Sequence, residues 1–137
     1  MPSGSIVEAL REALSSRQDI ALAVLFGSHA RQTDHAGSDV DVAVLPQTQW
    51  PLAAELELQA ELEARLRRPV DLVRVEDAGP LLAWEIARDG LFVVGDERRF
   101  ARFRAEAALA HAELAPMAEA AARHYIRRIA EDGMRHD

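Results

Sequence analysis

The sequence contains no cysteine, which excludes disulfide bonds and any chemistry that needs a thiolate. It also lacks an apolar run long enough to span a membrane, and its N-terminus lacks the basic flank and long apolar core of a signal peptide. These absences predict a soluble, cytoplasmic protein with no membrane partner.

Aromatic side chains and positive charge are also scarce. Aromatic residues make up 5% of the 137 residues, and the formal net charge is -7. Few aromatic rings leave little surface for stacking on bases, and an acidic surface repels polyphosphate backbones, so direct nucleic-acid binding is disfavoured. The length fits one domain with its own core and leaves no room for a second, substrate-binding domain. A large acceptor would therefore have to be positioned partly by contacts of its own or by another protein chain.

The hydrophobic pattern divides the first part of the chain into alternating helices and strands. We predict helices over residues 4–16, 28–31, 51–67 and 80–89, and strands over residues 20–26, 40–45, 69–75 and 91–94. This order predicts a small α/β or α+β domain in which helices pack against one sheet. Residues 1–95 are predicted to form the core of that domain.

Residues 96–137 are richer in alanine and arginine and predict a helical extension of the same domain. Pro116 interrupts the pattern, so two helices are predicted, over residues 97–115 and 116–131. Tyr125, the only tyrosine, is predicted to pack through its ring rather than to accept a transferred group. The predicted apolar anchors of these helices are Phe100, Phe103, Leu109, Leu114, Met117, Ile126 and Ile129.

A glycine and a serine follow the first predicted strand directly. Gly27 lets the backbone turn sharply and lets a phosphate approach closely, while Ser28 offers a hydroxyl and opens a short helix whose free N–H groups attract anions. Alone, this pair fits an ordinary strand-to-helix turn, but the carboxylates that follow favour phosphate binding. Arg31 is either a phosphate ligand or a surface charge, and His29 is either a nucleotide contact or a surface residue.

Three aspartates accompany this turn on predicted strands. Asp39 and Asp41 are two residues apart, so a strand would direct both carboxylates to one face. Asp71 lies in the middle of an apolar run, where burying an unpaired acid is costly. If its strand neighbours that of Asp41, the three carboxylates can bind Mg²⁺ or Mn²⁺ and accept a proton from an attacking hydroxyl.

The Gly-Ser pair, ten residues, Asp-x-Asp and a later strand aspartate together resemble the minimal nucleotidyltransferases of the DNA polymerase β superfamily. Within it, the small size, residues 27–31 (Gly-Ser-His-Ala-Arg) and the helical tail resemble the MNT antitoxins of HEPN/MNT toxin–antitoxin pairs. Many members of this family carry glycine after the arginine, where this chain has Gln32. The resemblance covers most of the chain, but its motif covers only residues 27–41.

The resemblance implies a nucleotidyltransferase fold with a mixed sheet, and transfer of AMP from ATP to a tyrosine hydroxyl of a cognate HEPN ribonuclease toxin, which neutralises the toxin. In this mechanism Asp39, Asp41 and Asp71 are the catalytic and metal-binding residues, and two Mg²⁺ ions are expected. The expected nucleotide-binding residues are Gly27, Ser28 and Arg31.

Two other functions stay open at the level of sequence. The chain could modify a small molecule, as aminoglycoside nucleotidyltransferases do, although it has no room for a second domain. It could also be an antitoxin that acts by binding alone, although Asp39, Asp41 and Asp71 are all present.

Overall fold

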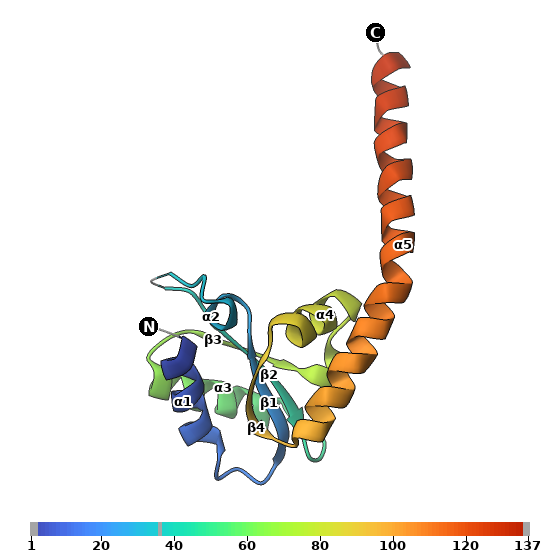
Figure 1. Cartoon of the computed structure of the whole chain (residues 1–137). Helices are drawn as coiled ribbons and strands as arrows, with labels where there is room; N and C mark the ends of the chain where they lie inside the picture. Colours follow the sequence, from blue (N-terminus) through green and yellow to red (C-terminus); the bar gives the residue numbers. More distant parts are fainter. Residues whose placement is uncertain (1–2, 36, 136–137) are drawn as a thin grey trace.

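The computed structural model in Figure 1 describes residues 3–35 and 37–135. It confirms the predicted alternation of helices and strands. In chain order the elements are α1 (Ser3–Leu14), β1 (Ile20–Phe26), α2 (Ser28–Arg31), β2 (Val40–Pro46), α3 (Leu52–Leu66), β3 (Val70–Arg74), the short 3-10 helix η1 (Val75–Asp77), α4 (Pro80–Asp89), β4 (Leu91–Gly95) and α5 (Glu97–Arg135).

The four strands form one mixed sheet in the order β3-β2-β1-β4. β1 pairs antiparallel with β2 and with β4, whereas β2 and β3 run parallel. Every residue of β1 is buried, because this inner strand is covered on both faces. The pairing of β2 with β3 also confirms that the strand of Asp71 lies beside the strand of Asp41.

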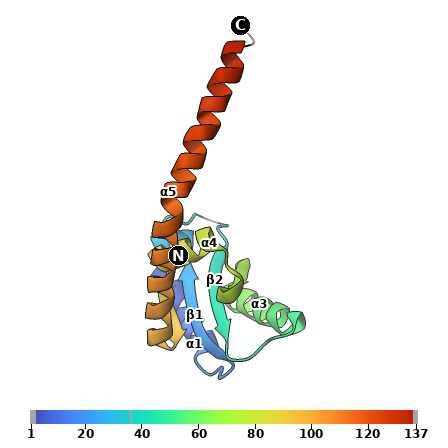
Figure 2. The same cartoon turned by 90° about the vertical axis from the view of Figure 1, so that its right-hand side faces the viewer.

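Each face of the sheet has its own apolar layer. On one face, leucines of α1 and α3, among them Leu10 and Leu62, pack against β-strand residues such as Leu25. On the other face, Ile86 of α4 and Phe100 of α5 pack with the next side chains along the same strands. Figure 2 shows α3 and α5 on opposite sides of the strands. Because successive side chains of a strand point to opposite faces, the sheet separates two apolar cores. Each polar side chain on a strand therefore lies on the side of one core or of the other.

The predicted break at Pro116 is wrong, because α5 is one helix of 39 residues that contains this proline. Proline removes one backbone hydrogen bond and crowds the preceding turn, at a cost of about 3 kcal/mol. The alanines and arginines on both sides favour helix, and an exposed helix bends at such a position instead of ending. Figure 1 shows the two parts of α5 running in different directions. Within residues 3–35 and 37–135, no helix is both long and apolar enough to cross a bilayer.

Only the first turns of α5 pack on the body of the molecule, which consists of the sheet and helices α1 to α4. Phe100 and Ala107 are buried and Phe103 is partly buried, which agrees with the predicted anchors at the start of the tail. The later predicted anchors are exposed, and so is the ring of Tyr125, which we predicted to pack. These predictions were wrong for the isolated chain because α5 leaves the body and no other element covers it. The exposed anchors are Leu109, Leu114, Met117, Ile126 and Ile129.

Candidate functional site

The turn after β1 and the carboxylate of Asp41 lie in direct contact. Gly27 is buried and adopts a φ of 76° and a ψ of -155°, a conformation nearly restricted to glycine. A side chain on Gly27 would overlap Oδ2 of Asp41. Phe26 of β1 also pairs with Asp41 of β2, which explains the approach. The glycine therefore leaves space for a carboxylate as well as giving the chain its turn.

The parallel pairing of β2 with β3 aligns Asp41 with Asp71. Asp39 immediately precedes β2 and shares the strand period of Asp41. Ala43 and Val73, two residues beyond Asp41 and Asp71, belong to the core under α4 and α5. Since strand side chains alternate between faces, the three aspartates lie on the same face as α4, at the end of the sheet next to α2.

Asp41 is the aspartate whose protonation is most strongly affected by its surroundings. Its pKa is raised from 3.8 to about 6, first by burial and then by the negative charges of Asp71, Asp39 and Glu85. His29 opposes this shift. Both burial and repulsion by like charges disfavour an ionised carboxyl group, and such perturbed acids are concentrated at functional sites. The end of the sheet is thus a cluster of negative charge without enough positive charge to balance it.

Glu85 is a member of this cluster that the sequence did not reveal. It projects from α4, and its charge contributes to the raised pKa of Asp41. Glu85 and Asp89 are four residues apart and share one face of α4. That spacing indicates an acidic helix face, but no pattern in the sequence places α4 beside α2 and β2.

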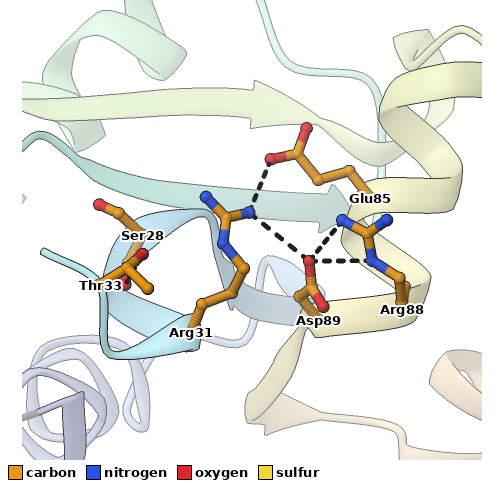
Figure 3. A network of polar contacts seen from close by, with 6 residues as sticks. All are labelled: Ser28, Arg31, Thr33, Glu85, Arg88 and Asp89. Carbon is orange, nitrogen blue, oxygen red and sulfur yellow. Dashed lines mark hydrogen bonds and ion pairs between the residues drawn. The ribbon is translucent and has the colours of Figure 1, made fainter.

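Arg31 contacts α4 rather than standing free beside the Gly-Ser turn. Its Nη1 lies 3.4 Å from Oε1 of Glu85 and 3.5 Å from Oδ2 of Asp89. Figure 3 shows the Arg31 side chain directed toward both carboxylates. Asp89 also binds Arg88 at 2.8 Å, so the two arginines share one carboxylate. The side chain of Arg31 is 39% exposed, and its role as a phosphate ligand stays a prediction. The observed contacts connect α2 to α4 at the edge of the carboxylate cluster.

His29 is fully buried, so the prediction of a surface role is wrong, while a nucleotide contact stays a prediction. Its Nε2 donates a hydrogen bond to the carbonyl oxygen of Ser38 over 3.2 Å, because that carbonyl can only accept. Its Nδ1 lies 3.6 Å from Oδ2 of Asp34. His29 therefore connects the Gly-Ser turn to the residue just before Asp39 and positions the two parts of the motif relative to each other.

Gln32 follows α2 at the position where the family resemblance favours glycine. It has a φ of 59° and a ψ of 33°, which is the left-handed region that glycine adopts most easily, and its N–H donates to the carbonyl of Ser28. The turn after α2 thus keeps its geometry without glycine, at a small cost in conformational energy.

Metal binding by Asp39, Asp41 and Asp71 stays a prediction. Among the residues described here, no group of three or more His, Asp or Glu side chains converges in the arrangement of a complete metal site. The repulsion that raises the pKa of Asp41 also favours side-chain positions that keep the carboxylates apart. Their oxygen ligands are the type that Mg²⁺ prefers.

Comparison with known proteins identifies the family. The sequence profile described as "Polymerase beta, Nucleotidyltransferase" matches residues 8–99, which include the Gly-Ser turn and all three aspartates. The chain belongs to this nucleotidyltransferase family. The matched region ends near the start of α5, so the projecting part of that helix lies outside it.

A curated relative and two solved structures extend the comparison. The protein adenylyltransferase MntA of Shewanella oneidensis is 32% identical over 93 residues, which are 68% of this chain and 65% of the relative. A chain from the crystal structure of a toxin–antitoxin with AMP-PNP is 25% identical with a TM-score of 0.71, over 92% of this chain and 99% of that chain.

The second structure shows a tri-AMPylated HEPN toxin of Shewanella oneidensis with its MNT antitoxin. A chain of this complex matches with a TM-score of 0.65 and 23% identity, over 90% of this chain and 95% of that chain. At this identity the likeness shows the shared fold alone.

Proposed function

We propose that this protein is an antitoxin that transfers AMP from ATP to a tyrosine hydroxyl of a cognate HEPN toxin and so neutralises it. The observation that carries the proposal is the contact of Gly27 with Asp41 and the alignment of Asp41 with Asp71, because a phosphate turn and paired carboxylates meet at one place. Membership of the nucleotidyltransferase family supports the reaction class. The adenylyltransferase named among its relatives supports AMP as the transferred group.

The ligand chemistry of the three aspartates suits two Mg²⁺ ions, or Mn²⁺ in their place, once their side chains converge. Asp39, Asp41 and Asp71 supply hard oxygen ligands, and the raised pKa of Asp41 indicates negative charge that a cation would compensate. When bound, the ions would neutralise charge on the triphosphate and on the attacking and leaving oxygens. We propose that Asp39 and Asp41 hold both ions and that Asp71 shares one.

The remaining steps are assigned to this chain's own groups. The turn at Gly27 and Ser28 binds the β and γ phosphates, and Arg31 exchanges its contacts with α4 for a phosphate oxygen. Asp71 accepts the proton of the acceptor hydroxyl, whose oxygen forms a bond to the α-phosphorus in line with the bond that breaks. Pyrophosphate leaves with the electron pair of the broken P–O bond, and AMP stays on the acceptor oxygen.

The test uses the protein that co-purifies with this chain, which we expect to be a HEPN toxin. The toxin is incubated with ATP and Mg²⁺ and either the wild-type chain or the Asp41→Asn variant, and intact masses are recorded. We expect whole AMP units to be added by the wild type only, and the ribonuclease activity of the toxin to fall as they are added. Asn has nearly the shape of Asp, so loss of transfer would be assigned to the carboxylate.

Other results would reject the proposal. A toxin that is tightly bound and inhibited without any gain in mass would indicate an antitoxin that acts by binding alone. Transfer to an added aminoglycoside with no transfer to the toxin would indicate a small-molecule enzyme.

A further inference from the structure

The apolar stripe that attaches α5 to the body continues along the part of the helix that projects from it. Phe100, Phe103 and Ala107 face the sheet, and residues at intervals of three or four share that face of a helix. Beyond the body the same face carries exposed residues, including Tyr125 with 67% of its surface accessible. We call this set the projecting stripe: Leu114, Met117, Ala121, Tyr125 and Ile129.

The projecting stripe begins beside α4, the helix that carries Glu85. The rings of Trp84 and His111 stack with centroids 4.3 Å apart and an angle of 6° between their planes, which attaches α5 to α4 at this point. Leu114 lines a small apolar hollow of about 70 Å³ together with Leu81, which is itself 81% exposed. The surface thus includes a notch of the size that one inserted side chain can fill.

The direction of α5 brings this surface to the end of the molecule where the candidate site lies. In Figure 1, α5 rises past α4 and extends beyond the end of the sheet that carries α2. Both α4 and α5 cover the sheet face that bears Asp41 and Asp71. A protein bound along the projecting stripe would therefore lie on the same side of the sheet as the carboxylates, and at the same end.

The projecting stripe is mainly apolar. At about 100° per residue, Arg123 and Arg127 fall on the opposite face of α5, while Arg128 and Asp132 both fall within the arc of the stripe, so its charges balance. An apolar helix face of a partner would complement such a strip.

We infer that the projecting stripe, with Leu81, is the docking surface for the acceptor protein, which would bind it through the apolar face of an amphipathic helix. The inference rests on the proposed function, because it assigns the acceptor's place. It also explains how a chain without a second domain holds a macromolecular acceptor. The body provides the reacting groups and α5 provides the contact area.

The test compares two double variants of α5 that each add two negative charges at exposed positions. Ala121→Glu with Tyr125→Glu alters the projecting stripe. Leu109→Glu with Ala120→Glu alters a face about 120° around the helix and is the matched control. The probe is the purified co-purifying HEPN toxin. Binding is measured by calorimetry, and AMP transfer is measured over a range of toxin and of ATP concentrations.

We expect the stripe variant to lose at least tenfold in affinity for the toxin and to raise the KM for the toxin by a similar factor. The KM for ATP should not change, and the control variant should match the wild type. Equal binding by the stripe variant, the control and the wild type would overturn the inference, as would a wild type that fails to bind the toxin.

Two further outcomes separate the docking surface from the catalytic proposal. If the wild type binds the toxin through the stripe but transfers no AMP, the docking surface stands and the proposed function fails. If the wild type transfers AMP and the stripe variant does so with an unchanged KM, the function stands and the docking surface fails. A wild type that is dimeric by light scattering, with a monomeric stripe variant, would assign the stripe to self-association and overturn the inference.

Discussion

The two faces of the sheet have different compositions and different consequences. The face under α1 and α3 is covered by aliphatic side chains along its length, among them Leu10, Leu58 and Leu62. The face under α4 and α5 is apolar over part of its length, but its end next to α2 carries Asp41 and Asp71. The same alternation of strand residues therefore builds a closed core on one side and a charged site on the other.

This difference separates stability from function. Burial of aliphatic groups on the first face stabilises the fold, whereas mutual repulsion of carboxylates on the second face opposes it. Asp41 shows the cost most clearly, because its pKa is raised by burial and by three acidic neighbours. Such repulsion is offset only when a cation or a positively charged ligand binds, because the opposite charge favours the ionised carboxylates.

The largest effect is expected from Gly27→Ala, at the turn beside the carboxylates. The added methyl group would overlap Asp41 and force an unfavourable backbone conformation. We expect about 3 kcal/mol of lost stability and loss of AMP transfer, measured by urea unfolding and by mass spectrometry of the acceptor. Gly133→Ala in α5, where nothing lies near the new methyl group, is the control and should retain both properties.

On the opposite face, Leu62→Ala should cost about 3 kcal/mol, because Leu62 is fully buried and its removal leaves a cavity. Transfer by the protein that stays folded should keep its rate. Leu56→Ala on the same helix is the matched control, since Leu56 is exposed and its loss should change stability by less than about 0.5 kcal/mol. A large fall in the transfer rate of folded Leu62→Ala would break the proposed separation of the two faces.

The pH dependence of stability should come from the charged face. Because the folded-state pKa of Asp41 is about 6 and its ordinary value is 3.8, the folded protein binds more protons than the unfolded chain between these values. Stability should therefore fall as the pH rises through this window. After screening by solvent, the contribution is about 1 kcal/mol. Urea unfolding of wild type and Asp41→Asn at pH 4 and pH 7 checks it, and an identical pH dependence in both proteins would contradict it.

The smallest effect concerns the turn after α2. Gln32→Gly removes the cost of a left-handed conformation but increases the freedom of the unfolded chain, so we expect a gain below about 1 kcal/mol. Calorimetric unfolding should show a slightly higher midpoint with unchanged AMP transfer. A clear loss of stability would mean that the side chain of Gln32 makes a contribution beyond its backbone conformation.

The sequence predicted the parts of the fold that depend on local pattern. The continuous apolar run of β1 and the spacing of Asp39 and Asp41 were sufficient to predict the inner strand and the shared face. The pairing of β2 with β3 was the condition under which Asp71 would join Asp39 and Asp41, and the structure confirms it. Where a residue's environment follows from its own strand, sequence was a reliable guide.

Features that depend on packing between distant segments were not predictable. Glu85 joins the cluster because α4 lies near the carboxylate end of the sheet, and the buried His29 contacts Asp34 and Ser38, which come later in the chain. Pro116 was expected to end a helix, but the helix-forming residues around it outweigh its local cost. The exposure of Tyr125 follows from the direction of α5, which no local pattern gives.

The most direct test of the account is the effect of MgATP on the unfolding free energy of wild type and Asp41→Asn at pH 8. Without nucleotide, we expect the variant to be at least as stable as the wild type, because repulsion is relieved. At about 100 times its Kd, MgATP should stabilise the wild type by about 2.7 kcal/mol and the variant far less. Equal stabilisation of both proteins, or a variant that is less stable without nucleotide, would contradict the claim that these carboxylates form the site that binds metal and nucleotide.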